Sequence, residues 1–185
     1  MDIEQNKEKI KLQFDIIKRT DSYIATTNNK AALLLAVNGA TATIISNKAG
    51  GLMGLFNHSK LYALVLCILF FMVALFISLS FFCSLKSIIP NMSFRKEKND
   101  AMESNFSFVY IANLDGGQEY FDKYINESES KLLLDMCHQS FILSYIAKQK
   151  FTHFSFAVNW IKFAYVCLLI MVVLKFIDYA NGVLL

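Results

Sequence analysis

The side chains most often used in catalysis are scattered along this 185-residue chain and form no familiar motif. The three histidines (His58, His138 and His153) lie in different segments. His138 cannot form a nucleophile–base pair with the adjacent Cys137, because neighbouring positions on a helix point about 100° apart. The sequence contains no HExxH, GxSxG, P-loop or GxGxxG motif. We therefore expect no enzymatic activity, no catalytic residue, no metal site and no cofactor.

Basic side chains that alternate with aromatic ones point to binding instead. Phosphates pair with Lys or Arg and bases stack on aromatic rings, so a small anionic nucleotide is one ligand that fits. An anionic lipid headgroup is the alternative. The net charge of +3, with both signs mixed along the chain, does not favour a nucleic-acid partner. The candidate nucleotide-binding residues are Arg19, Tyr23, Lys30, Tyr110, Lys148 and Lys150.

The composition indicates that these residues are positioned by membrane helices. Hydrophobic residues make up 55% of the chain and charged residues 18%, against about 25% charged in soluble domains. Residues 61–85 carry no charge and exceed the length of about 20 residues that a helix needs to cross the bilayer core. Residues 158–180 form a second apolar segment. We predict that both segments span a membrane.

Residues 31–47 are a weaker candidate, because this uncharged stretch also contains small and polar residues. Such side chains suit contacts between membrane helices, although a soluble amphipathic helix is the alternative. We interpret three residues here and two near the last span as helix-packing or gating residues: Asn38, Gly39, Thr41, Lys175 and Asp178. The simpler interpretation of the last two is that they end the span.

Lys and Arg near the span ends gather on the side that holds the N-terminus and the central region, which predicts that this side is cytoplasmic. The predicted fold is an all-α membrane protein with three transmembrane helices and a cytoplasmic helical bundle. Its order is a cytoplasmic amphipathic N-terminal helix (1–30), first span (31–47), external loop (48–60), second span (61–85), cytoplasmic sensing region (86–157), third span (158–180) and tail (181–185).

Local patterns predict the cytoplasmic elements. A seven-residue isoleucine repeat marks an apolar stripe that packs on the C-terminal helix or on a second copy of the chain. We expect a polar loop at 91–104, an extended segment at 106–113, a turn at Asp115-Gly-Gly (a phosphate-binding nest is the alternative) and a helix at 118–126. Ser128 or Ser130 caps the next helix, which continues into the last span because neither Pro nor Gly interrupts 118–181.

The order of these segments resembles the transmembrane effector family of the bacterial Pycsar antiphage systems. The resemblance covers roughly residues 15–180. It is carried by Asp21-Ser-Tyr23, Thr26-Thr-Asn-Asn-Lys-Ala31, Leu33-Leu-Leu-Ala-Val-Asn-Gly39, Ile89-Pro-Asn91, Phe108-Val-Tyr-Ile-Ala112 and Ser140-Phe-Ile-Leu-Ser-Tyr-Ile-Ala-Lys-Gln-Lys-Phe151.

The resemblance implies a multi-pass protein of the bacterial inner membrane whose N-terminus and central region are cytoplasmic. A partner nucleotide cyclase would make cyclic UMP or cyclic CMP on infection. The effector would respond by impairing inner-membrane integrity, so that infection is abortive. Its expected partners are the lipid bilayer, the cyclic pyrimidine mononucleotide and further copies of itself. The alternative function is a non-catalytic membrane anchor or scaffold for a cytoplasmic enzyme.

Overall fold

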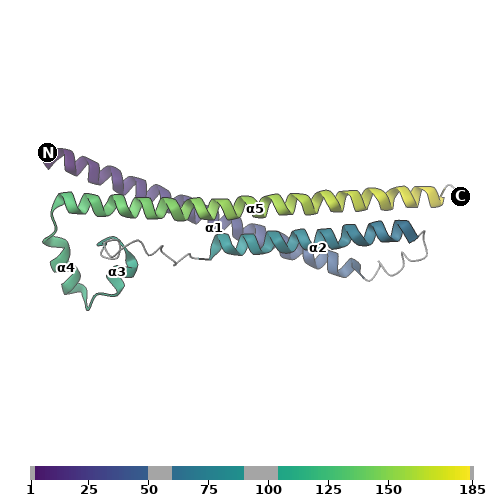
Figure 1. Ribbon diagram of the computed structural model, residues 1–185, viewed down its shortest axis with the longest axis horizontal. Coiled ribbons are helices and arrows are strands. Elements are labelled where there is room, and N and C mark those ends of the chain that lie inside the picture. The colour runs from purple at the N-terminus through teal and green to yellow at the C-terminus, as the bar shows by residue number, and fades with distance from the viewer. Residues whose placement is uncertain (1–2, 50–59, 90–103, 184–185) are drawn as a thin grey trace. The chain divides into compact units, whose positions relative to one another are not determined.

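The described residues of the chain are helical apart from short connections. The computed structural model describes residues 3–49, 60–89 and 104–183, and within them it contains five helices. They are α1 (Ile3–Ala49), α2 (Lys60–Ile88), α3 (Phe108–Ala112), α4 (Gly117–Ile125) and α5 (Glu129–Val183) (Figure 1). Most of the predicted loops at 48–60 and 91–104 and the end of the predicted tail lie outside the described residues.

Contacts within the chain define two units. The first unit contains Met1–Thr26 and Pro90–Gln149, and the second contains Thr27–Ile89 and Lys150–Leu185. The two long helices, α1 and α5, each contribute to both units. The predicted boundary between an N-terminal helix (1–30) and a first span (31–47) therefore falls inside one uninterrupted helix.

The second unit packs α1, α2 and α5 around a narrow interior of small, polar and a few larger apolar side chains, and most of its large apolar side chains are exposed. The innermost apolar positions include Ala31 and Ala164, both fully buried. By contrast, Phe71 is 72% exposed and Phe176 is 70% exposed. In water this arrangement would expose far more contiguous apolar surface than soluble proteins tolerate. In lipid it is favourable, because small residues let helix backbones approach each other while large apolar side chains face the acyl chains.

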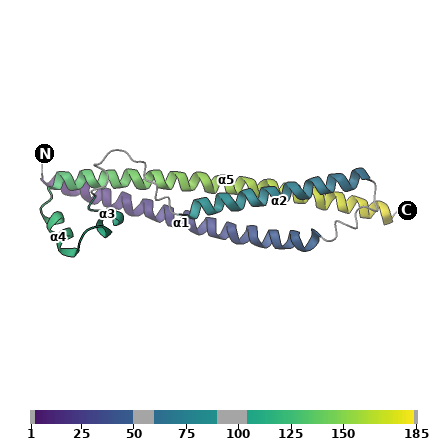
Figure 2. The same ribbon diagram turned by 60° about the horizontal axis from the view of Figure 1, so that its bottom comes forward.

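The buried stripe of the second unit alternates spacings of three and four residues. On α2 the buried positions are 63, 66, 73, 77, 80, 84 and 87, and on α5 they include 150, 157, 161 and 164. Such a repeat, close to 3.5 residues, keeps one seam of each helix facing its partners. Figures 1 and 2 both show α2 lying beside the later part of α5. The contact includes Phe76 of α2 stacked on Trp160 of α5, with ring centroids 5.7 Å apart.

Two of the described helices are long and apolar enough to cross a membrane. They are Leu61–Ile88 of α2 and Glu129–Ala180 of α5. These helices contain the predicted spans 61–85 and 158–180. The predicted span at 31–47 is the last part of α1, which is not one of these two helices, because its amide and hydroxyl side chains make it less apolar. The all-helical fold is thus confirmed, together with two apolar helices of membrane-spanning length.

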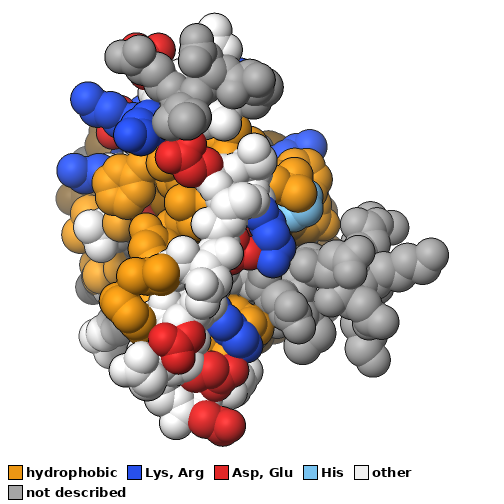
Figure 3. Space-filling view, turned by 90° about the vertical axis from the view of Figure 1, so that its left-hand side faces the viewer, with side chains coloured by type: hydrophobic (Ala, Val, Ile, Leu, Met, Phe, Trp, Pro, Cys, Tyr) orange, Lys and Arg blue, Asp and Glu red, His pale blue; other side chains and the backbone are white. Residues whose placement is uncertain are grey.

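In the first unit, the N-terminal part of α1 packs on the first part of α5. The Ser140 hydroxyl of α5 donates a hydrogen bond to Gln13 Oε1 of α1, at 2.9 Å. The isoleucine stripe is half-buried at Ile10, Ile17 and Ile24. Of the two partners that the sequence allowed for this stripe, the structure shows the chain's own C-terminal helix. The face of the molecule in Figure 3 shows Lys and Arg side chains intermixed with Asp and Glu and with hydrophobic side chains.

The prediction of an extended segment at 106–113 is wrong, because this segment contains the short helix α3. The backbone N–H of Ile111 donates to the Ser107 carbonyl at 2.9 Å, and that of Asn113 donates to the Tyr110 carbonyl at 3.0 Å. A strand needs a neighbouring strand for its backbone hydrogen bonds, whereas a helical turn satisfies them locally. The alternation of Phe, Ser and Val was therefore a weak signal without a partner strand.

The starts of α4 and α5 agree with their sequence signals. The predicted helix at 118–126 is α4, shifted by one residue. Ser128, rather than Ser130, caps α5: its hydroxyl accepts a hydrogen bond from the Lys131 N–H at 3.4 Å. From Glu129 the helix continues to Val183, which confirms the uninterrupted helix that the absence of Pro and Gly predicted.

The cap predicts different outcomes at two neighbouring serines. Ser128→Ala should destabilise the first turn of α5 by about 0.5–1 kcal/mol, because the Lys131 N–H loses its side-chain acceptor and keeps only the Ser128 carbonyl. Ser130→Ala should have a much smaller effect, since position 130 lies inside the helix. Hydrogen exchange at residues 129–134 in detergent-solubilised protein measures both variants. Equal loss of protection in the two would contradict the assignment.

Candidate functional site

A line of polar side chains runs along the buried face of α2 in the second unit. Ser80, Ser84 and Ser87 are fully buried and recur at the three-to-four spacing of one helix face. Asn38 of α1 is 1% exposed and donates from Nδ2 to Ser80 Oγ at 3.1 Å. Ser80 Oγ donates in turn to the backbone carbonyl of Ala157 of α5, at 2.9 Å. One hydroxyl thus connects three helices.

The other predicted packing residues of the first span have different surroundings. Thr41 Oγ1 lies 3.4 Å from the Tyr165 hydroxyl of α5 and also donates to the Val37 carbonyl of its own helix. Gly39 is exposed, and a Cβ at this position would meet nothing within 4 Å. Asn38 and Thr41 therefore face neighbouring helices, whereas Gly39 lies on the outer face of α1.

Near the end of α5, Lys175 is exposed and Asp178 is half-buried. Asp178 interacts electrostatically with Tyr62, at the start of α2. This interaction is close to where the predicted span ends.

Lys150 of α5 is deeply buried beside the last turn of α2, where the line of Ser80, Ser84 and Ser87 ends. Its side chain is 6% exposed, and its ammonium donates to Asn28 Oδ1 at 3.0 Å, to the Ser87 carbonyl at 2.6 Å and to the Ile88 carbonyl at 3.1 Å. An ammonium has three N–H donors, and these contacts occupy all of them. In this structure the Lys150 ammonium therefore donates to protein oxygens, and its predicted place in a nucleotide site stays a prediction.

The remaining candidate nucleotide-binding residues divide between the units. Lys30 is exposed on α1 in the second unit, whereas Arg19, Tyr23, Tyr110 and Lys148 belong to the first unit. The six residues therefore do not form one described cluster.

Three of them share a side of the first unit. Within this unit α1 and α5 run in the same direction (Figures 1 and 2). Tyr23 and Lys148 lie about two to three turns beyond the Gln13–Ser140 contact. Because a helix turns by about 100° per residue, this register points both side chains to the same side of the pair, with Arg19 and Tyr145. All four are exposed.

Tyr110 has a partner of its own. The Lys123 ammonium of α4 donates to the Tyr110 hydroxyl at 3.0 Å and lies 5.3 Å from the centre of its ring. Lys123 also pairs with Glu119 at 2.8 Å. The hydrogen bond from Lys123, together with that from the Asp115 backbone N–H, holds the pKa of the Glu119 carboxyl below its usual value. The same pairing raises the pKa of Lys123.

This network also bears on the Asp115-Gly-Gly segment. The Asp115 backbone N–H donates to Glu119 Oε2 at 2.9 Å. A side chain that reaches back from the first turn of a helix in this way satisfies a donor that the helix start leaves open. With that N–H engaged by Glu119, the segment acts as the turn that begins α4, and this favours the simpler of the two interpretations.

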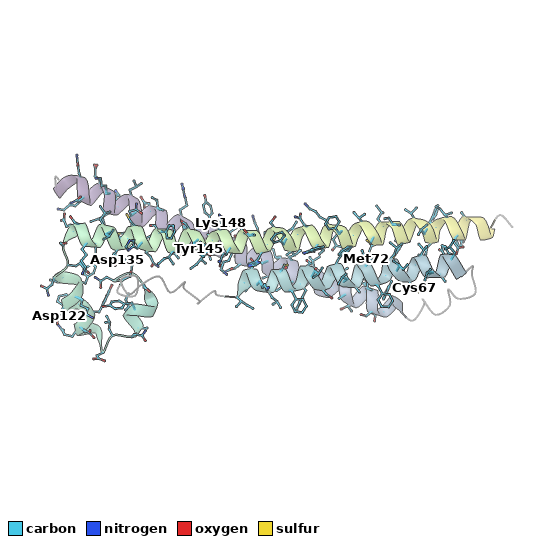
Figure 4. All side chains as sticks on the ribbon, in the orientation of Figure 1. Cys67, Met72, Asp122, Asp135, Tyr145 and Lys148 are labelled. Atoms are coloured by element: carbon cyan, nitrogen blue, oxygen red, sulfur yellow. The ribbon has the colours of Figure 1, made fainter. Side chains whose placement is uncertain are left out.

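A residue that the sequence did not single out, Asn105, organises the first unit. It is 5% exposed, and its backbone N–H donates to Asp135 Oδ2 of α5 at 2.7 Å. Its side-chain amide donates to Glu127, and its carbonyl accepts from the Tyr120 hydroxyl at 3.0 Å. Asn105 thereby ties α4 and α5 together. Its partner Asp135 is labelled on α5 in Figure 4. Glu127 is half-buried in this network.

The described side chains provide binding and packing groups rather than a reactive cluster. In residues 3–49, 60–89 and 104–183, no three His, Cys, Asp or Glu side chains come together as a metal site. The buried polar side chains of the second unit are hydroxyls, one amide and one ammonium. Among them, Asn38, Ser80, Ser87 and Lys150 bond to one another or to backbone carbonyls. This arrangement can hold the three helices together.

The bond between Asn38 and Ser80 predicts energetic coupling. Single replacements Asn38→Ala and Ser80→Ala should each lower the free energy of unfolding in detergent by about 1 kcal/mol, since bonds between membrane helices contribute about 0.6 kcal/mol on average and up to about 1.7. The double variant should cost less than the sum, because both replacements remove the same bond.

The matched control is Ser78→Ala. The Ser78 hydroxyl is exposed and bonds only to the Ala74 carbonyl of its own helix, so its removal should leave stability nearly unchanged. Strict additivity of the Asn38 and Ser80 effects would show that the bond does not contribute.

Comparison with known proteins agrees with this description. The sequence model of the Pycsar effector protein domain matches residues 13–177, which include parts of both units. The chain is 64% identical to the Pycsar effector protein EcPycTM of Escherichia coli over 185 residues, the full length of both proteins. No solved structure matches the chain. With its inside-out packing and two long apolar helices, the chain is a membrane protein that belongs to the Pycsar effector family.

Proposed function

We propose that this protein is an antiphage effector that impairs the bacterial inner membrane when it binds a cyclic pyrimidine mononucleotide, cyclic UMP or cyclic CMP. The observation that carries the proposal is the full-length match to a Pycsar effector protein, which supports a role in antiphage defence. The packing of the second unit supports the membrane as its target. A partner cyclase would supply the nucleotide, and the protein itself would be non-enzymatic.

Three features of α1 support a third membrane-spanning segment at residues 31–47. Leu33 and Ile44 are 70% and 63% exposed, whereas Asn38 between them is buried. This distribution is the same as that of α2 and α5, with large apolar side chains outside and polar ones inside. Asn38 would find no hydrogen-bond partner in lipid, so its bond to Ser80 favours a position beside α2 at membrane depth. The N-terminus and the region 86–157 would then share the cytoplasmic side.

The cytoplasmic ligand would bind on the first unit. Arg19 and Lys148 offer cations to a phosphate, and Tyr23 and Tyr145 offer rings to a base. These four residues lie on the same side of the α1–α5 pair, which supports a ligand site there. A scaffold function is less favoured, because the isoleucine stripe that would dock a partner enzyme is half-buried against the chain's own helices.

Membrane potential in living cells tests the function. Cells that express the protein with an active uridylate or cytidylate cyclase should depolarise, because ligand binding shifts the protein toward a membrane-impairing state. The same cells with a catalytically inactive cyclase should keep their potential. If the protein is inserted and the active cyclase causes no depolarisation, the proposal fails and the scaffold function gains support.

Binding to the purified protein tests the location of the ligand. Arg19→Ala and Lys148→Ala should each weaken affinity for the cyclic nucleotide about tenfold, the loss expected when a charged hydrogen bond to phosphate is removed. Lys9→Ala and Lys162→Ala are matched controls, since both residues are exposed elsewhere on the same two helices. Isothermal titration with cyclic UMP and cyclic CMP gives the affinities. Equal affinity in all four variants would place the ligand elsewhere.

A further inference from the structure

Lys150 carries a buried positive charge that takes no part in the proposed ligand site. Its three hydrogen bonds go to neutral oxygens: the Asn28 amide of α1 and the carbonyls of Ser87 and Ile88 of α2. Removing an ammonium from water is costly unless its donors are satisfied, so these contacts must hold together for the charge to remain buried. Each of the three helices of the second unit contributes to the arrangement.

The contact with α2 lies at the electrostatically favourable end of that helix. Ser87 and Ile88 belong to its last turn, where backbone carbonyls lack partners within the helix and carry a partial negative charge. The Ser87 hydroxyl returns a hydrogen bond to the Lys150 carbonyl at 3.1 Å. Lys150 therefore caps α2 from α5 while it also holds α1 through Asn28.

Farther along the seam, two buried polar atoms lack a partner among the described residues. They are Asn38 Oδ1 and Ser84 Oγ. A buried polar atom without a hydrogen bond is unfavourable, and water would satisfy it. The packed arrangement thus contains groups that gain hydrogen bonds if the helices separate and water enters.

We propose that Lys150 is a latch that holds α1, α2 and α5 in a closed, dry packing, and that its release lets water into the seam lined by Asn38, Ser80 and Ser84. The inference rests on the proposed function, because a hydrated seam through the helix bundle is a route by which a membrane loses its integrity. To the proposed function, the latch adds two details: Lys150 keeps the resting protein closed, and the seam is the path that opens.

Cysteine labelling of purified protein in lipid nanodiscs tests the latch without any nucleotide. The reporter is Ser84→Cys in a chain whose four native cysteines are replaced by Ala, and the reagent is a water-soluble maleimide. Adding Lys150→Met, which keeps the side-chain length but removes the donors, should raise the labelling rate at position 84 about tenfold or more. Adding Lys162→Met, an exposed lysine of the same helix, should leave the rate unchanged.

A second reporter separates opening from misfolding. Ser78→Cys lies on the exposed face of α2, so opening of the seam should not alter its labelling, whereas general unfolding would raise labelling at both positions. An unchanged rate at position 84 in the Lys150→Met chain, or an equal rise at positions 78 and 84, would overturn the latch.

A variant with the opposite expected effect keeps the proposal testable even if Lys150→Met fails to fold. Asn28→Asp supplies a carboxylate to the same ammonium and should strengthen the latch, so labelling at position 84 should fall severalfold below that of the parent chain. Faster labelling in Asn28→Asp would contradict the proposal. These experiments need no cyclase, so they test the latch separately from the proposed function. If labelling changes as expected but cells with an active cyclase do not depolarise, the proposed function is rejected and the latch is retained.

Discussion

Hydrocarbon offers no hydrogen bonds, and this constraint organises the second unit. A polar side chain on a helix that contacts lipid must find its partner on its own helix, as Ser78 does, or on a neighbouring helix. The seam of α2 meets this constraint through Ser80, which accepts from Asn38 and donates to α5, and through Ser87, which bonds the backbone of Lys150. Most of the large apolar side chains are left to face outward. Directional bonds between buried polar side chains therefore add to the apolar contacts of Val73, Ile77 and Ala164 in holding the second unit together.

The first unit uses the same kind of bonding in a different setting. Asn105 engages its backbone N–H, its carbonyl and its side-chain amide with α4 and α5. Charged residues surround this network, including the Lys123–Glu119 pair of α4. The helices α1 and α5 each contribute residues to both units.

Several elements could be predicted from local sequence because their causes are local. The absence of Pro and Gly predicted the uninterrupted α5, and a serine just before it predicted its cap. The polar residues that follow the Asp115-Gly-Gly turn predicted α4. The short helix α3 was missed, because alternating residues indicate a strand only when a second strand is available. The buried serines of α2 were overlooked in a segment that looked apolar on all sides, although their spacing of four and three residues was visible.

The sequence by itself determined that the chain is helical, that residues 61–85 and 158–180 are apolar enough for a membrane, and which family it resembles. These properties depend on composition, periodicity and the order of segments. Only the tertiary structure decided which polar residues meet. Lys150 looked like a phosphate ligand as one of several lysines, but Asn28, Ser87 and Ile88, far from it in sequence, occupy all of its donors. Hydrogen bonds are short-ranged and directional, so the partners of a buried charge follow from how the helices pack.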